Sequence, residues 1–180
     1  PRQVFQPDAP PFRLMNAEAR ANRLAKLGVD HLYQLQFNKA LAALTPEEFA
    51  REVLVEGLAI SHIVVGADFC FGKDRAGKAA DLQALGARFG FATTIAPLLA
   101  IEGQEVSSTA IRTALAEGRP GDAAAMLGHL HRIEGEVVHG EKRGRELGYP
   151  TANMALTGLH LPRFGVYAVK VDVLGDPRAG

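Results

Sequence analysis

Apolar and polar residues alternate along the chain at helical spacing over several segments. Residues 16–27 place alanines and leucines on one helical face and are followed by Gly28, which predicts an amphipathic helix that ends there. Thr45-Pro-Glu-Glu combines an N-cap, a proline at the first helical position and first-turn acids, which predicts a second helix reaching about Glu56. The same reasoning predicts three more helices, over residues 79–89, 109–117 and 120–127.

Strand-like runs alternate with these helices in the first two thirds of the chain. The pattern predicts strands over residues 29–37, over Ile63 to Val65 and over residues 92–95. Helices and strands in alternation favour a parallel sheet, so we expect an α/β domain over residues 1–128.

After Gly128 the pattern becomes β-rich. Residues 132–138 and 166–173 alternate between apolar and polar side chains, which is typical of half-buried strands. We therefore expect a second, β-rich domain over residues 129–180.

Composition excludes several classes of protein. The chain has 180 residues and 47% hydrophobic content, which suffices for one large or two small domains. Twenty basic residues balance twenty acidic ones, so bulk charge favours neither nucleic acid nor an anionic membrane surface as a partner. No stretch approaches the roughly 20 apolar residues of a membrane span, and no signal peptide is evident. The single cysteine, Cys70, excludes an internal disulfide and suits a reducing cytosol, so we expect a cytoplasmic protein.

The segment 137–153, VVHGEKRGRELGYPTAN, has the pattern of a strand, a glycine-rich basic loop and a turn. Its glycines allow the backbone to approach a ligand closely, and its cations can bind phosphate oxygens. These residues are Gly140, Lys142, Arg143, Gly144, Arg145 and Gly148. Thr151 and Asn153 follow Pro150 and supply two neutral oxygens, which could help to hold a hydrated magnesium ion. A solvated basic hairpin would have the same residue types.

Two further segments are candidates for nucleotide contacts. The run SHIVVGADFCFGKDRAG, residues 61–77, places Asp68 and Phe69 just after a predicted strand, where ligands bind in open α/β sheets. In VSSTAIR, residues 106–112, three hydroxyls precede a predicted helix and Arg112 lies one turn further on, so hydroxyls and free N–H groups could converge on an anion. The alternatives are an ordinary loop with core phenylalanines and an ordinary N-cap.

These motifs together resemble the bacterial bifunctional riboflavin kinase/FAD synthetases. The string GxxRGRxLGxPTAN, residues 140–153, is close to the signature of the riboflavin kinase module, and SSTAIR resembles the SSTxIR motif of the nucleotidylyltransferase module. The resemblance implies an α/β Rossmann-like nucleotidylyltransferase domain followed by the start of a small antiparallel β-barrel. It also implies Mg²⁺ as cofactor, ATP, riboflavin and FMN as substrates, and synthesis of FMN and FAD.

The resemblance also assigns roles to residues. It implies catalytic roles for Ser107, Ser108, Thr109 and Arg112. It implies nucleotide binding by Asp68, Phe69, Gly140, Arg143, Gly144, Arg145, Gly148, Pro150, Thr151 and Asn153, with Thr151 and Asn153 also as metal ligands.

Two family motifs have no counterpart in this sequence, an HxGH segment near the N-terminus and a later glutamate of the kinase barrel. From the resemblance we therefore expect a fragment that lacks both ends of the family's chain. Two other classes stay open, a non-catalytic nucleotide- or flavin-binding module and a different nucleotidylyltransferase. The second of these would explain SSTAIR but not RGRELGYPTAN.

Overall fold

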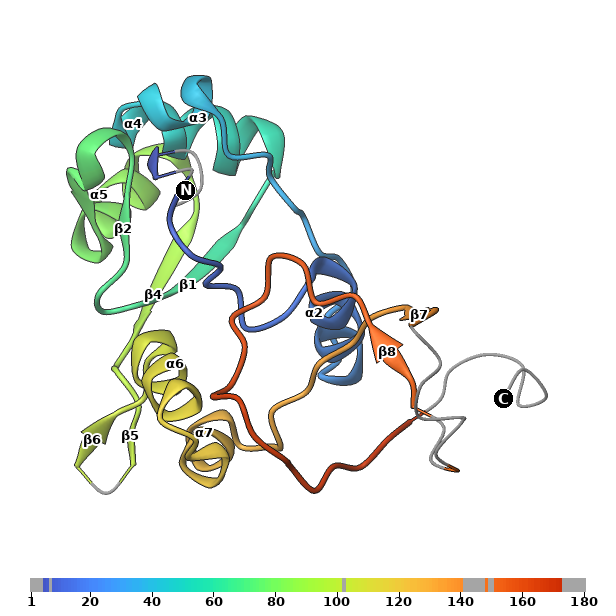
Figure 1. Cartoon of the computed structure of the whole chain (residues 1–180). Helices are drawn as coiled ribbons and strands as arrows, with labels where there is room; N and C mark the ends of the chain where they lie inside the picture. Colours follow the sequence, from blue (N-terminus) through green and yellow to red (C-terminus); the bar gives the residue numbers. More distant parts are fainter. Residues whose placement is uncertain (1–4, 7, 102, 141–147, 149–150, 173–180) are drawn as a thin grey trace.

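The computed structural model describes residues 5–6, 8–101, 103–140, 148 and 151–172 (Figure 1). Its helices are α2 (Ala17–Lys26), α3 (Lys39–Ala43), α4 (Pro46–Glu48), the π-helix η1 (Phe49–Gly57), the 3₁₀-helix η2 (Lys73–Arg75), α5 (Ala79–Phe89), α6 (Ser108–Ala116) and α7 (Pro120–Leu127). Its strands are β1 (His62–Gly66), β2 (Cys70–Phe71), β3 (Gly77–Lys78), β4 (Ala92–Ala96), β5 (Ala100–Ile101), β6 (Gln104–Glu105), β7 (Val137–Val138) and β8 (Asn153–Met154).

The predicted helices are confirmed, and side-chain caps mark the start of three of them, α2, α4 and α6. Asn16 caps α2, its side-chain oxygen accepting from the Ala19 N–H at 2.8 Å. Thr45 and Glu48 form a reciprocal capping box, and α4 then continues directly into η1. No helix in the described part of the chain combines the length and apolarity needed to cross a membrane.

A parallel pair of strands forms the centre of the first half. β1 and β4 pair in register from His62 with Ala92 to Gly66 with Ala96, and α5 is the crossover between them. η1 and α5 pack on this pair (Figure 1). The buried residues of this core are Ala50, Leu54, Val65, Phe71, Ala79, Leu82 and Phe91. The predicted parallel pairing is therefore confirmed for these two strands.

A second, smaller core lies between α6 and α7. Its buried residues are Ile111, Ala114, Leu115 and Ala123. Each helix is followed by a left-handed glycine, Gly118 with φ 76° and Gly128 with φ 70°. Gly118 reverses the chain between the two short helices, which lie against each other (Figure 1), and Gly128 ends α7.

The predicted strand over residues 29–37 is wrong. The segment is not helical and pairs with no described strand, and its apolar side chains are exposed, Val29 by 42% and Leu35 by 48%. A strand exists only through hydrogen bonds to a neighbour, so a strand-like pattern alone does not make one.

The β-rich pattern of the second domain is realised only in part. Within 132–138 only β7 forms, and it pairs with β8 in an antiparallel register. The described residues of 166–173 form no strand, and Val166 and Val171 are largely exposed. The described residues of this region form one small antiparallel pair, and the β-barrel stays a prediction.

Candidate functional site

The carboxyl ends of β1 and β4 form one edge of the parallel pair. The Ala67 N–H donates to the Ala96 carbonyl at 2.9 Å, so both chains leave the sheet side by side. Asp68 follows at once and is exposed, while Phe69 is half-buried and stacks on Phe71 with ring centroids 5.7 Å apart. Asp68 is therefore available to a ligand at this edge, whereas Phe69 also packs against the core.

The N-terminus of α6 returns to the neighbourhood of the same strand. Beyond β4 the chain makes the hairpin β5–β6, and the Val106 N–H then donates to the Leu99 carbonyl at 2.9 Å. Ser107 is the N-cap of α6, its hydroxyl accepting from the Ala110 N–H at 3.2 Å. The capping role of Ser107 is thus confirmed, and its phosphate contact stays a prediction.

Arg112 lies one turn into α6, with its guanidinium held by two neighbours. Its Nη2 donates to the Thr109 hydroxyl at 3.1 Å, and its Nη1 donates to the Phe12 carbonyl at 3.3 Å. The side chain is half-buried. Thr109 and Arg112 are thus brought together by a direct contact near the start of the helix.

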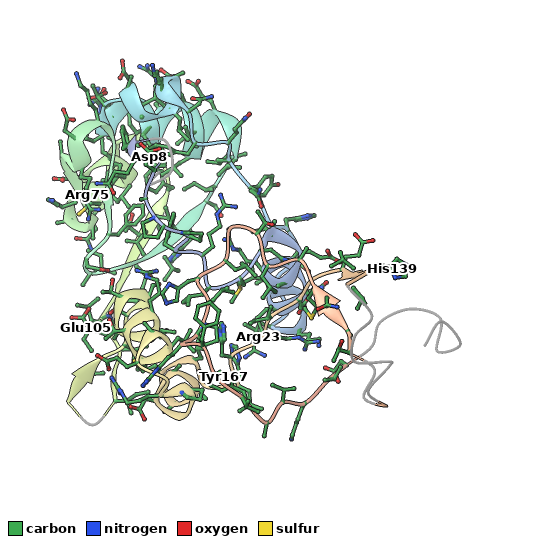
Figure 2. All side chains as sticks on the ribbon, in the orientation of Figure 1. Asp8, Arg23, Arg75, Glu105, His139 and Tyr167 are labelled. Carbon is green, nitrogen blue, oxygen red and sulfur yellow. The ribbon has the colours of Figure 1, made fainter. Side chains whose placement is uncertain are left out.

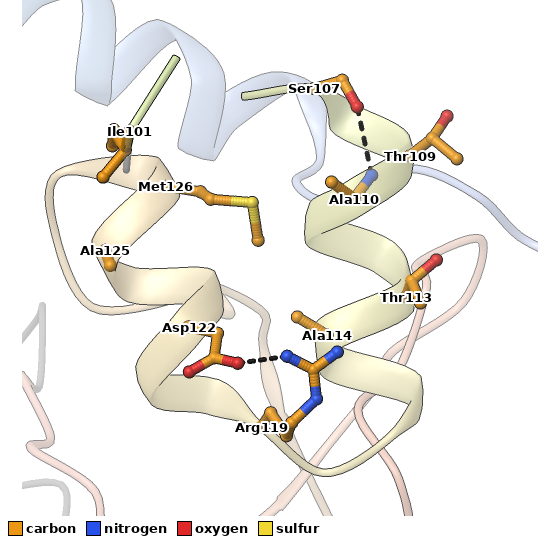
Figure 3. A pocket seen from close by; sticks show the side chains of 10 residues that line it. All are labelled: Ile101, Ser107, Thr109, Ala110, Thr113, Ala114, Arg119, Asp122, Ala125 and Met126. Atoms are coloured by element: carbon orange, nitrogen blue, oxygen red, sulfur yellow. Dashed lines mark hydrogen bonds and ion pairs between the residues drawn. The ribbon is translucent and has the colours of Figure 1, made fainter. Parts of the chain in front are cut away.

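A pocket of about 540 Å³ lies between α6 and α7 (Figure 3). Its lining residues are Ile101, Ser107, Thr109, Ala110, Thr113, Ala114, Arg119, Asp122, Ala125 and Met126. An ion pair between Arg119 and Asp122 joins two of these side chains. Two of the predicted hydroxyls, Ser107 and Thr109, therefore line a hollow, whereas Ser108 and Arg112 are not among its lining residues.

The PTAN motif, residues 150–153, ends in β8, which pairs with β7 in an antiparallel register. Val138 is the register partner of Asn153, which places Gly140 against the Asn153 side chain. A Cβ atom at Gly140 would lie 2.9 Å from the Asn153 Cγ, which is closer than such contacts allow. Thr151 and Asn153 are both exposed, and Gly148 has a left-handed φ of 82°. Only a glycine at position 140 leaves the Asn153 amide where it lies.

Four of the predicted site residues lie outside the described residues. These are Arg143, Gly144, Arg145 and Pro150, and Lys142 lies with them. Their roles stay predictions.

Exposed oxygen ligands at Thr151 and Asn153 fit magnesium. Mg²⁺ prefers hard oxygen ligands and usually keeps several waters when it bridges phosphates. Within the described ranges no three His, Cys, Asp or Glu side chains cluster closely enough to enclose a metal ion. Thr151 and Asn153 are the residues of this motif whose side-chain oxygens would hold a magnesium ion.

Sequence reasoning missed a group of histidines beside α6. His160 contacts the Arg112 carbonyl through Nε2 at 3.0 Å. His131 lies near it, with a buried Nε2 that has no hydrogen-bond partner in the part of the chain that the structure describes. Burial lowers the pKa of His131, and the neighbouring His129 and His160 lower it further. No local sequence motif predicts the contact between His160 and Arg112, because these residues are 48 positions apart along the chain.

Cys70 has a basic environment beside the Asp68 edge. Arg75, which Figure 2 labels, and then Lys78 lower the pKa of the Cys70 thiol. The Lys78 ammonium lies 3.4 Å from the sulfur. A lowered pKa raises the thiolate fraction at neutral pH, and the thiolate is the reactive form. We expect Lys78→Met to raise this pKa and to slow iodoacetamide alkylation at pH 7 by roughly threefold.

The measurement is the alkylation rate of Cys70 as a function of pH. Lys73→Met is the matched control, because this exposed lysine is not among the causes of the shift. An unchanged pH midpoint in Lys78→Met would show that the ammonium does not act on the thiol.

The fold and these contacts define a class of protein, an α/β chain with exposed hydroxyls at the N-terminus of a helix and an antiparallel pair of strands after it. Comparison with protein families makes this specific. The family model for FAD synthetase matches residues 1–110, and the model for riboflavin kinase matches residues 127–179. The chain belongs to the FAD synthetase family, with a riboflavin kinase region after it.

Curated relatives agree with both matches. The chain is 42% identical over 180 residues to a bifunctional riboflavin kinase/FMN adenylyltransferase of Pseudomonas fluorescens. The alignment covers 100% of this chain and 58% of the relative. It is 40% identical over 176 residues to the protein of the same description from Escherichia coli K12, covering 98% of this chain and 56% of the relative. The chain therefore spans little more than half the length of these relatives.

A solved structure shares the fold. It is described as a macrolide-efflux protein from Streptococcus pneumoniae, and it superposes with a TM-score of 0.72 at 37% sequence identity. The match covers 86% of this chain and 49% of that one. The arrangement of helices and strands is thus shared with an experimentally determined structure.

Proposed function

We propose that this chain acts in the synthesis of FMN and FAD. One activity phosphorylates riboflavin with MgATP to give FMN, and the other joins AMP from ATP to FMN, releasing pyrophosphate. The observation that carries the proposal is the succession of an FAD synthetase match and a riboflavin kinase match within one chain. The proposal includes the domain boundary between residues 128 and 129 and a cytoplasmic location, with nucleotides and flavins as partners.

For adenylyl transfer, α6 would supply the phosphate contacts. The free N–H groups of its first turn carry partial positive charge, and the exposed Ser108 and Thr109 add hydroxyl donors there. Arg112, already bonded to Thr109, would stabilise the negative charge that develops as pyrophosphate leaves. Ser107 would orient this end of the helix, and Asp68 and Phe69 would border the cleft at the edge of the sheet.

For riboflavin phosphorylation, the PTAN turn would hold the nucleotide. Thr151 and Asn153 would bind magnesium, which neutralises phosphate charge when bound. Arg143 and Arg145 of the glycine-rich motif would contribute positive charge to bind the phosphates. Catalysis of phosphoryl transfer depends mainly on positioning and charge neutralisation, so the orientation of the Asn153 amide matters directly.

Calorimetric titration of the 180-residue chain tests this proposal. We expect ADP to bind more tightly with magnesium than without it, because the ion bridges the phosphates to neutral oxygens. We also expect FMN to bind, and neither phosphopantetheine nor nicotinate mononucleotide to compete with it.

The Thr151→Ala/Asn153→Ala variant then locates the nucleotide. Loss of the magnesium-dependent part of ADP binding would support the kinase site. Nucleotide binding that persists would belong to the α6 site. A chain that binds neither ADP nor FMN would contradict the proposed function, and competition by phosphopantetheine or nicotinate mononucleotide would favour a different nucleotidylyltransferase.

A further inference from the structure

The riboflavin kinase region contacts the preceding part of the chain through Glu134, which bonds to Asn16 and Asn22, and through residues 159–163. Residues 159–163 run along α6 and the segment at Phe12 and Arg13 (Figure 1). Leu159 is 6% exposed and forms a parallel bridge with Arg13. The contact is thus anchored by a buried apolar side chain as well as by hydrogen bonds.

Three backbone carbonyls receive hydrogen bonds within this contact. The His160 N–H donates to the Arg13 carbonyl at 2.8 Å, and the Arg163 N–H donates to the Leu115 carbonyl at 2.9 Å. The His160 ring contacts the Arg112 carbonyl through Nε2 at 3.0 Å. A carbonyl only accepts, so Nε2 carries the proton in this bond. Leu115 lies in the last turn of α6, and its carbonyl also accepts from the Gly118 N–H at 3.1 Å.

Arg112 lies at the centre of a closed circuit of contacts. Its guanidinium donates to the Phe12 carbonyl. The carbonyl of the next residue, Arg13, accepts from the His160 N–H. The His160 ring then donates to the Arg112 carbonyl. The side chain of Arg112 is thus held by Phe12, and its main-chain carbonyl is held by His160, which itself bonds to the neighbouring Arg13 carbonyl. The remaining guanidinium contact is to Thr109, a residue of the candidate phosphate site.

We propose that His160 is a positioning residue for the α6 site, holding Arg112 and hence Thr109 in place from the riboflavin kinase region. The proposal rests on the proposed function, in which α6 binds the nucleotide that donates AMP. His160 does not touch the nucleotide. It links the two regions of the chain, so the position of Arg112 and Thr109 in the α6 site depends on the contact that the riboflavin kinase region makes with α6.

The alternative is that His160 makes a purely structural contact. The substitution His160→Gln distinguishes this alternative from the positioning role. The amide nitrogen of a glutamine reaches the position of the histidine Nε2 and donates the same bond, whereas alanine does not. A role that depends on the donor is restored in His160→Gln, while a role that depends on the ring's shape is not. His31→Ala is a matched control, since that histidine is exposed and contacts only Tyr33 among the described interactions.

The first readout is hydrogen exchange of the 180-residue chain, followed by mass spectrometry. In His160→Ala we expect amides of α6 to exchange roughly fivefold faster, as for the loss of about one hydrogen bond, while those of α5 stay unchanged. His160→Gln is expected to exchange like the parent chain. Unchanged exchange in α6 of His160→Ala would overturn the proposal, as would equal effects of alanine and glutamine. Unchanged α5 also verifies that the variant is folded.

The second readout is ATP affinity, measured in the Thr151→Ala/Asn153→Ala background so that only the α6 site contributes. We expect roughly fivefold weaker binding for His160→Ala and restored binding for His160→Gln, without change for His31→Ala. If this background binds no ATP, the proposed adenylyl site fails, and the exchange experiment still decides whether His160 positions α6. Binding that is unaffected by His160→Ala would overturn the positioning role.

Discussion

Gly140→Ala is expected to weaken magnesium-dependent ADP binding by roughly ten- to hundredfold, the range typical for displaced supports of a metal ligand. The new methyl group would overlap the Asn153 amide, with the Cγ only 2.9 Å from the added carbon. The Asn153 side chain is exposed and can rotate away, so the chain avoids the overlap at little cost in stability. This rotation changes the orientation of the Asn153 amide, which is a predicted magnesium ligand.

A thermodynamic cycle with Asn153→Ala isolates this mechanism. If Gly140 acts through the Asn153 amide, the double variant Gly140→Ala/Asn153→Ala binds no more weakly than Asn153→Ala alone. Calorimetry with ADP and magnesium gives all four affinities. Gly165→Ala is the control, because a Cβ atom there meets only Tyr167, at an ordinary distance of 3.6 Å. Full additivity of the two substitutions would contradict the mechanism, and so would unchanged affinity in Gly140→Ala.

Helices were predictable from the sequence because their ends are encoded locally. Thr45 is the N-cap that the sequence predicted, α5 has the predicted bounds, and the helix predicted over residues 16–27 forms over Ala17–Lys26 with Asn16 as its cap. The prediction for α6 began one residue late, since Ser107 rather than Ser108 is the cap. A cap involves residues only three apart, so neighbouring letters carry the information.

Strands were less predictable because a strand depends on a partner that is distant in sequence. The runs at β1 and β4 pair through the α5 crossover and form as expected. Residues 29–37 have an equally strand-like pattern, yet no described strand lies beside them. Alternation of apolar and polar residues indicates that a segment suits a half-buried sheet, but it does not indicate whether a neighbouring strand is present.

The sequence also predicted the local features of the candidate site and missed its long-range contacts. Sequence motifs located the hydroxyls at the start of α6 and the PTAN turn, because each motif is contiguous. They did not reveal that Gly140 packs on Asn153 or that His160 reaches the Arg112 carbonyl. The second of these contacts joins residues 48 positions apart. Such pairings follow from tertiary packing, and a single sequence carries no direct record of them.

Gly86→Ala is expected to destabilise the chain by about 2 kcal/mol, in the range for overpacking of a close-packed core. Gly86 is a buried residue of α5, and the chain reverses at Gly90, which has a left-handed φ of 88°. The N–H groups of Gly90 and Phe91 both donate to the Gly86 carbonyl, at 2.8 and 3.0 Å. This reversal lays Phe91 against Gly86, so an added methyl group would meet the Phe91 carbonyl oxygen and would lie 3.1 Å from its ring carbons.

Relief of this overlap requires backbone movement, because the Phe91 carbonyl is main chain and Phe91 is itself a core residue. Gly121→Ala in α7 is the matched control, since a Cβ atom there meets nothing within 4 Å. Alanine is the better helix former, so this control is expected to stabilise the chain by up to about 1 kcal/mol. Urea unfolding followed by circular dichroism measures both changes. The two glycine-to-alanine substitutions should therefore have opposite signs, and a shared sign would show that α5 does not pack tightly on the turn leading into β4.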